Sequence, residues 1–240
     1  MRLVSSVPYF QAGNVTIYHG DCREVLALLP ANAVDVIVTD PPYGVKWKSN
    51  HRNTSFGSIA GDEDQDVAAS GLIASLRCLR PYRHVYAFGR LPWDGMAITS
   101  PVELVWDKGQ PAGGNVALPW APEHEYIQFG VYVPSKANRK DGYGRLSARL
   151  RQGSVLSVPR VNGVAVQRHP TEKPVLLLRY LIESSSLIGE TVLDPFMGSG
   201  STLEAALIEG RRSVGVEVDE RYCELAARRL ELLAAQGAVA

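Results

Sequence analysis

Short runs of apolar residues alternate along the chain with longer amphipathic segments. The run 34–38 is apolar apart from one acid and predicts a buried strand, whereas 67–79 has the apolar spacing of a helix. The predicted strands cover 15–18, 34–38, 84–88, 102–106, 126–133, 191–193 and 213–217, and the predicted helices cover 22–29, 67–79, 175–187, 202–209 and 220–234. This alternation predicts an α/β fold whose mostly parallel sheet is covered by helices on both faces.

Two stretches break the alternation, 44–66 and 134–168, and the second is rich in Gly, Ser and Arg. Long irregular segments within a compact domain are usually functional loops or small binding insertions. At 240 residues the chain fits one α/β domain, so we expect a single domain over 1–240 that carries both stretches as insertions. Trp106, Trp120 and Phe129 are expected in its core.

The cysteines indicate a reducing compartment. Cys22, Cys78 and Cys223 lie far apart without C-x-x-C spacing, which is typical of buried thiols rather than disulfides or metal ligands. The sequence shows neither a charged-then-apolar leader nor an apolar run near the roughly 18 residues of a membrane span. We therefore expect a cytoplasmic protein with no membrane segment and no metal site.

Charge is balanced in total but unevenly distributed, with 25 Lys and Arg against 25 Asp and Glu. Basic residues gather in 46–61, which holds no acid, and in 132–180, where the only acids are Asp141 and Glu172, whereas acids gather in 62–66 and 217–224. Segregated charge is typical of a phosphate-facing surface on an otherwise neutral body, and chance clustering on a solvated surface is the alternative. The residues expected to meet the phosphates of a nucleic acid are Lys46, Lys48, Arg52, Arg139, Lys140 and Arg145.

A glycine-rich turn between the strand 191–193 and the helix 202–209 is the strongest local pattern. Its glycines permit a tight turn, and the helix start offers free N–H groups to an anion. The turn lacks the lysine of a Walker loop, and Leu203 stands where a dinucleotide fingerprint has its third glycine, so a carboxylate ligand fits better than a pyrophosphate. The candidate cofactor-binding residues here are Asp194, Pro195, Phe196, Gly198, Ser199, Gly200, Ser201 and Thr202.

Glu217 supplies the second part of the same site. It ends the strand that follows the glycine-rich turn, where nucleotide-binding folds place an acid that holds a ribose diol. A ligand with a carboxylate and a ribose describes S-adenosylmethionine, which we expect as the cofactor. The alternative is a tight strand-to-helix turn that binds nothing.

The motif Asp40-Pro41-Pro42-Tyr43 follows the strand 34–38. Its prolines remove backbone donors and fix φ, so the chain leaves the strand tip rigidly. The Asp40 carboxylate and the Pro41 carbonyl can accept both hydrogens of an amino group while the Tyr43 ring stacks on the heterocycle. We expect all four residues to be catalytic and Asp40 to be a cofactor-binding residue as well; a structural Pro-Pro turn is the alternative.

The two motifs, in this order, resemble the circularly permuted beta class of amino-group DNA methyltransferases, in which D-P-P-Y precedes F-x-G-x-G. The resemblance covers nearly the whole chain and implies a Rossmann-like S-adenosylmethionine-dependent fold with a mostly parallel seven-stranded sheet, circularly permuted, with short insertions. Three further segments match: Gly20-Asp21-Cys22, the H-x-x-x-K-P segment from His169, and Gly215–Asp219 with Tyr222. They add the cofactor-binding residues Asp21, Cys22, His169, Thr171, Lys173 and Val218.

The resemblance implies a bacterial or phage DNA methyltransferase of the kind found in restriction–modification systems. It would methylate N6 of an adenine flipped out of double-stranded DNA. D-P-P-Y rather than S-P-P-Y favours adenine N6, while N4 of cytosine, an RNA base and a catalytically silent DNA-binding relative are the alternatives. The resemblance also admits a homodimer.

Both insertions acquire an expected role from this resemblance. The stretch 44–66 is expected to be a DNA-contacting loop, and 134–168 is the candidate target-recognition insertion. The second is very short for that purpose, which argues against strict sequence specificity but not against the chemistry.

Overall fold

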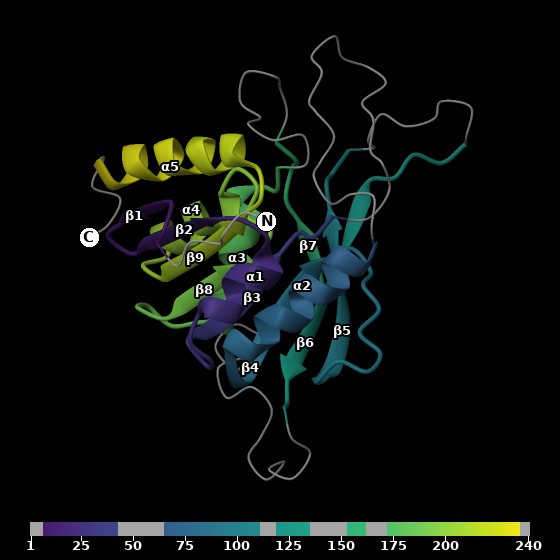
Figure 1. Cartoon of the computed structure of the whole chain (residues 1–240). Coiled ribbons are helices and arrows are strands. Elements are labelled where there is room, and N and C mark those ends of the chain that lie inside the picture. The colour runs from purple at the N-terminus through teal and green to yellow at the C-terminus, as the bar shows by residue number, and fades with distance from the viewer. Residues whose placement is uncertain (1–6, 43–64, 111–118, 135–152, 162–171, 236–240) are drawn as a thin grey trace.

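A mixed sheet organises the computed structural model of the chain, which describes residues 7–42, 65–110, 119–134, 153–161 and 172–235. In these residues nine strands follow the order β1-β2-β9-β8-β3-β4-β6-β5-β7 (Figure 1). The strands are β1 (Phe10–Ala12), β2 (Val15–His19), β3 (Val34–Thr39), β4 (Leu79–Phe88), β5 (Ile98–Asp107), β6 (His124–Tyr132), β7 (Val155–Ser157), β8 (Thr191–Asp194) and β9 (Arg212–Glu217). Pairing is parallel from β2 through β4, and β6 is antiparallel to both β4 and β5, so the predicted mostly parallel sheet is confirmed.

Helices cover both faces of this sheet. The helices of the described residues are α1 (Cys22–Leu28), α2 (Gln65–Cys78), α3 (Val175–Ser185), α4 (Ser201–Ile208) and α5 (Glu220–Ala235). Apolar side chains of α1 and α2 pack on one face, and Figure 1 shows these two helices side by side in front of the strands. Side chains of α3, α4 and α5 pack on the other face. Among the described residues, no helix combines the length and the apolar character that crossing a membrane requires.

Two short edge strands extend the seven that were predicted. β1 forms an antiparallel hairpin with β2, and Gly13, at φ +52°, supplies the turn. β7 pairs in parallel with β5 at the other edge. Each has three residues, too few to show the alternation of a strand, so the sequence did not reveal them.

β3 is a fully enclosed strand at the centre of the sheet. All of its residues are buried, as expected for a parallel strand covered on both faces. Its one acid, Asp35, is held by Arg80 at 2.6 Å and Arg83 at 3.3 Å and accepts the N–H of Thr191 from β8. This buried charge is therefore paired, and it fixes β3 against β8 at the amino ends of the strands.

β3 and β8 flank the point where the winding of the chain reverses. From β8 the chain crosses through α4 to β9 on one side, and from β3 it crosses through α2 to β4 on the other. Ligands of open α/β sheets bind at the carboxyl ends of the strands at such a switch point. Asp194 ends β8 and Asp40 directly follows β3, so both motifs meet at this edge of the sheet, here called the carboxyl edge.

The permuted strand order is visible in the positions of β8 and β9. They come last in the sequence but lie between β2 and β3, which come early. The strand that carries Asp40 is thereby placed next to the strand that carries the glycine-rich turn, as the resemblance implied.

The large aromatic residues expected in the core differ in their exposure. Trp106 is 2% exposed and donates its Nε1–H to the carbonyl oxygen of Val158 at 2.7 Å, and Phe129 packs against the same apolar cluster. The prediction for Trp120 is wrong, since this residue is 85% exposed. Pro119 and Pro122 flank the segment and cannot donate to a strand ladder, which leaves Trp120 outside the sheet before β6 begins.

Candidate functional site

Asp194 joins the two strands at the switch point. Its Oδ1 accepts the hydroxyl hydrogen of Thr39 at 2.9 Å and the N–H of Phe196 at 3.1 Å, and its carboxylate also accepts a hydrogen bond from Thr202. Burial raises the pKa of Asp194 to about 6, although these hydrogen bonds oppose the rise. The side chain thus fixes the glycine-rich turn to the tip of β3, one residue from Asp40.

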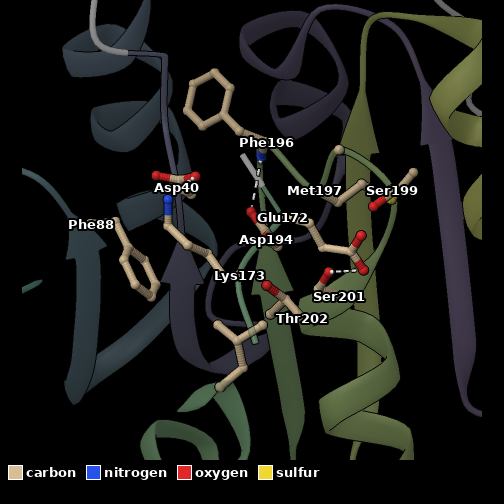
Figure 2. A pocket seen from close by; sticks show the side chains of 12 residues that line it. Asp40, Phe88, Glu172, Lys173, Asp194, Phe196, Met197, Ser199, Ser201 and Thr202 are labelled. Carbon is tan, nitrogen blue, oxygen red and sulfur yellow. Dashed lines mark hydrogen bonds and ion pairs between the residues drawn. The ribbon is translucent and has the colours of Figure 1, made fainter. Parts of the chain in front are cut away.

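Asp40 lies beside Lys173 at the same tip (Figure 2). The Nζ atom of Lys173 is 2.7 Å from Asp40 Oδ2, 3.2 Å from Glu125 Oε2 and 5.0 Å from the centre of the Phe88 ring. Burial alone would lower the pKa of Lys173, but the charges of Asp40 and Glu125 outweigh burial and raise it. The structure therefore places a buried ammonium between two carboxylates, with one of them in the predicted catalytic motif.

The glycine-rich turn needs glycine for its backbone as well as for its packing. Gly198 has φ +51° and Gly200 has φ +82°, in the left-handed region. A Cβ on Gly200 would also lie 2.9 Å from the Cβ of Ala226 on α5. Gly200 is thus required by the fold itself, whereas Gly198 borders the cavity of the site.

Glu217 contacts this turn directly through one of its carboxylate oxygens. Its Oε2 accepts the N–H of Gly198 at 3.0 Å, and its Oε1 accepts the N–H of Asp219 at 2.8 Å. Burial raises the pKa of Glu217 to about 7, and the backbone hydrogen bonds only partly oppose the rise. The carboxyl group is therefore close to balance between its charged and neutral forms at neutral pH.

Asp21 and Cys22 begin α1 just after β2, the strand next to β9, and the preceding Gly20 donates its N–H to the Glu217 carbonyl oxygen at 2.9 Å. Asp21 caps α1 by accepting the N–H of Arg23, and the side-chain hydrogen bonds from Arg23 hold the pKa of Asp21 below its usual range. Cys22 is 4% exposed and packs in the apolar cluster of α1 and α2. Its side chain thus belongs to the core, and only its backbone is available to a ligand. The next predicted position, Val218, is 48% exposed.

A small cavity of about 60 Å³ lies among these groups. Asp40 and Lys173 line it on one side, and Phe196, Ser199 and Thr202 line it from the glycine-rich turn and α4 (Figure 2). Pockets for nucleoside-sized ligands are typically roughly 300 Å³ or more, so this cavity encloses only part of such a ligand.

Arg229 supports the turn from behind. It lies on α5, is 6% exposed, and its Nη1 is 2.8 Å from Glu172 Oε1 and 3.3 Å from the carbonyl oxygen of Ser199. Its Nε also bonds the carboxylate of Glu204 on α4. Because Glu172 directly precedes Lys173, α5 ties the glycine-rich turn to the segment that carries the buried ammonium.

Part of the predicted site lies outside the described residues, namely Tyr43, Lys46, Lys48, Arg52, Arg139, Lys140, Arg145, His169 and Thr171. The described neighbours show where these segments are anchored. Pro42 and the start of α2, the described residues on either side of 43–64, both lie at the carboxyl edge. Pro134 follows the end of β6, which lies at the opposite edge because β6 is antiparallel to β4.

Phe88, Lys108 and Glu125 lie at the carboxyl edge of the sheet, and they were not identified as site residues from the sequence. Phe88 ends β4, Lys108 follows β5, and Glu125 stands near the start of the antiparallel strand β6. Their positions at strand ends are the one signal that could have indicated them. Using it requires the strand order and the direction of β6, which the predicted elements alone do not give.

Comparison with known proteins matches residues 97–228 to a family model described as DNA methylase, of the N6/N4 type. The chain is 33% identical over 88% of its length to YubD of Escherichia coli K12, which is named as a methylase, and the match covers 88% of YubD. It is 26% identical over 90% of its length to the DNA adenine methyltransferase YhdJ of Escherichia coli K12, with 83% of YhdJ covered.

Solved structures of DNA methyltransferases have a similar fold. A Thermus thermophilus protein, TTHA0409, solved in complex with S-adenosyl-L-methionine, superposes with a TM-score of 0.60 at 26% identity and covers 90% of this chain and 94% of that one. The cytosine-N4-specific PvuII DNA methyltransferase superposes with a TM-score of 0.68 at 17% identity, covering 92% of this chain and 88% of its own. The predicted fold class is confirmed.

Proposed function

Since the chain belongs to the N6/N4 DNA methylase family, we propose that it transfers a methyl group from S-adenosylmethionine to N6 of an adenine in DNA. The observation that carries the proposal is the hydrogen bond from Thr39 to Asp194, which joins the D-P-P-Y strand to the glycine-rich turn. Asp40, the acid suited to bind an amino group, directly follows Thr39, and Asp194 begins the turn that is suited to bind the cofactor. The D-P-P-Y sequence and the likeness to YhdJ support adenine, and the likeness to the PvuII enzyme makes N4 of cytosine the second candidate.

The residues present fit S-adenosylmethionine, which supplies an activated methyl group on a sulfonium when bound. Glu217 would hold the ribose hydroxyls, since its buried carboxylate lies where the family places a ribose acceptor and already contacts Gly198. Asp21 stands beside it at the next strand end. The lining of the small cavity by Ser199 and Thr202 gives the polar surface that an amino-acid moiety needs.

The chain's own residues act on the target amine. The Asp40 carboxylate and the Pro41 carbonyl accept its two hydrogens, which draws the nitrogen toward a tetrahedral geometry and localises its lone pair. The negative charge of Asp40 then lies nearest to the nitrogen on which positive charge develops, and a preorganised charge of this kind is a large catalytic effect. The Tyr43 ring would stack on the base, which must leave the duplex to reach this edge.

Nucleoside analysis tests the proposal. The protein is incubated with methyl-labelled cofactor and either duplex DNA or RNA of matched sequence, and the nucleic acid is digested and separated. We expect label in N6-methyldeoxyadenosine. Label in N4-methyldeoxycytidine would reassign the base, and label in RNA alone would overturn the DNA substrate.

The affinity for S-adenosylhomocysteine should rise with pH because of Glu217. Its pKa is raised from 4.5 to about 7, so the free carboxyl group is mostly neutral at pH 6 and mostly ionised at pH 8. If the ionised form accepts the ribose hydroxyls, affinity should increase about tenfold over this range. Isothermal calorimetry measures it, and Glu217→Gln should flatten the dependence. A wild-type profile that is already flat would assign the ribose to another acceptor.

DNA binding should depend on the basic segment after D-P-P-Y. Both anchors of 43–64 lie at the carboxyl edge, which supports contact with DNA there, whereas 135–152 has one flank at the opposite edge, at the end of β6, and the other toward the carboxyl edge, where β7 pairs with the end of β5. Replacing Lys46, Lys48 and Arg52 with Gln should reduce the slope of log K against log salt by up to about 0.9 for each phosphate that the protein no longer neutralises.

The matched variant replaces Arg139, Lys140 and Arg145 with Gln, and fluorescence anisotropy of labelled duplex gives both slopes. A larger reduction in this second variant would make 134–168 the principal DNA-binding segment. Both variants should keep the wild-type affinity for S-adenosylhomocysteine.

A further inference from the structure

Four charged side chains of alternating sign form a row that ends at Asp40. Lys108 Nζ is 2.6 Å from Glu125 Oε1, Lys173 Nζ is 3.2 Å from Glu125 Oε2, and Lys173 Nζ is 2.7 Å from Asp40 Oδ2. The four come from the end of β5, the start of β6, the segment before α3 and the tip of β3. Glu125 is the member that contacts both lysines, with one carboxylate oxygen on each.

The row is largely shielded from water. The side chains of Lys108 and Lys173 are 12% and 8% exposed, and that of Glu125 is 33% exposed. The rings of Trp106 and Phe88 lie 5.2 Å and 5.0 Å from the two ammonium groups. A buried ammonium is costly without counter-charges, so each of the two carboxylates beside Lys173 stabilises its charged form.

The site makes two demands on Asp40. Its carboxylate neutralises Lys173, and in the proposed reaction it also accepts a hydrogen from the target amine. A carboxylate that is free to turn would satisfy one demand at the expense of the other, and misplacing a reacting group by about 1 Å can cost a hundredfold in rate. An ammonium held in a fixed place would orient the carboxylate for both.

We propose that Glu125 is a positioning residue for methyl transfer, which holds Lys173 against Asp40 Oδ2 and so orients the Asp40 carboxylate toward the target amine. Lys108 restrains Glu125 through the other oxygen of its carboxylate. The inference rests on the proposed function, because it takes the amine-binding role of Asp40 from there.

Loss of Glu125 should also change how activity depends on pH. The charged groups facing Lys173 are Asp40 and Glu125, while Lys108 faces Glu125 and Asp194 is the next carboxyl group near Asp40. Without the Glu125 charge, Lys173 is buried with one counter-charge, so its pKa falls. The ammonium then loses its proton at a lower pH, and activity should decline earlier as pH rises.

The test is Glu125→Gln in the full chain, which keeps the shape of the side chain and removes its charge. We expect kcat to fall between about tenfold and a hundredfold. KM for duplex DNA and the calorimetric affinity for S-adenosylhomocysteine should stay at wild-type values, and the alkaline limb of the kcat profile should move to lower pH. Glu123→Gln, at an exposed carboxylate two positions earlier, should leave all four quantities unchanged.

Lys108→Met is the second variant, and it should reduce kcat less than Glu125→Gln because Lys173 keeps both carboxylates. It carries the test if Glu125→Gln fails to fold. Wild-type kcat and pH profile in Glu125→Gln would overturn the proposal, as would a loss that follows only the unfolding temperature. If the wild-type enzyme methylates cytosine instead of adenine, the target base is revised and the comparison of Glu125→Gln with the wild type stays valid. If it methylates no DNA, both the proposed function and the role of Glu125 are overturned.

Discussion

Asp40→Ala should abolish methyl transfer to DNA while S-adenosylhomocysteine still binds. The substitution removes the acceptor for the target amine and the charge nearest the nitrogen that becomes positive. Losing one preorganised group of this kind typically costs on the order of 10²–10³ in rate, and the variant also releases Lys173 from one of its two carboxylates. Single-turnover transfer of labelled methyl groups measures the loss, and calorimetry measures cofactor binding.

Asp40→Asn separates the two contributions of this side chain. The amide still accepts one hydrogen bond but carries no charge. The rate of methyl transfer by Asp40→Asn should therefore be lower than that of the wild type and higher than that of Asp40→Ala. Full activity in Asp40→Asn would remove the electrostatic part of the mechanism. An equal loss of cofactor affinity in Asp40→Ala would instead make Asp40 a cofactor residue.

Gly198→Val should eliminate cofactor binding. Gly198 has φ +51°, lines the cavity, and donates its N–H to Glu217. A β-branched residue in the left-handed region is strained by roughly 1–2 kcal/mol, and its side chain would enter the space that the ligand needs. We expect calorimetry with S-adenosylhomocysteine to detect no binding.

Gly189→Val controls for the backbone strain alone. Gly189 has φ +79°, a Cβ there would meet nothing within 4 Å, and it stands before β8 at the opposite edge of the sheet. A comparable loss of stability in both variants, with binding kept in Gly189→Val, would assign the effect at Gly198 to the site. Binding retained in Gly198→Val would remove the turn from the cofactor site.

The sequence predicted the long elements because their patterns depend on local burial. All seven longer strands and all five helices of the described residues lie where the apolar spacing placed them. β5 and β4 are the partial exceptions: β5 begins at Ile98 rather than Val102, and β4 begins at Leu79 rather than His84. Pro81 within this stretch and Tyr82, at φ +63°, obscure a strand pattern that the pairing with β3 imposes.

The candidate site was predictable where its chemistry resides in contiguous motifs. Asp40, Asp194, Gly198 and Glu217 come together as their motifs indicated. Glu125 and Arg229 were not predictable, because each is a single charged residue in a strand or helix whose surroundings look ordinary. Their roles arise from partners that lie far away in sequence, and only the folded chain identifies those partners.

The permuted order of the strands has a consequence for synthesis. During translation β2 and β3 leave the ribosome early, yet the two strands that fill the space between them, β8 and β9, emerge last. Until then β2 and β3 each present an unpaired edge, the kind of surface that holdase chaperones cover and that otherwise promotes aggregation. The same late segment carries Asp194, Gly198 and Glu217, so a nascent or truncated chain lacks the proposed cofactor site. Under the proposed function, chains that have not yet reached β9 cannot modify the DNA that they meet, and methylation begins only after this strand has been made.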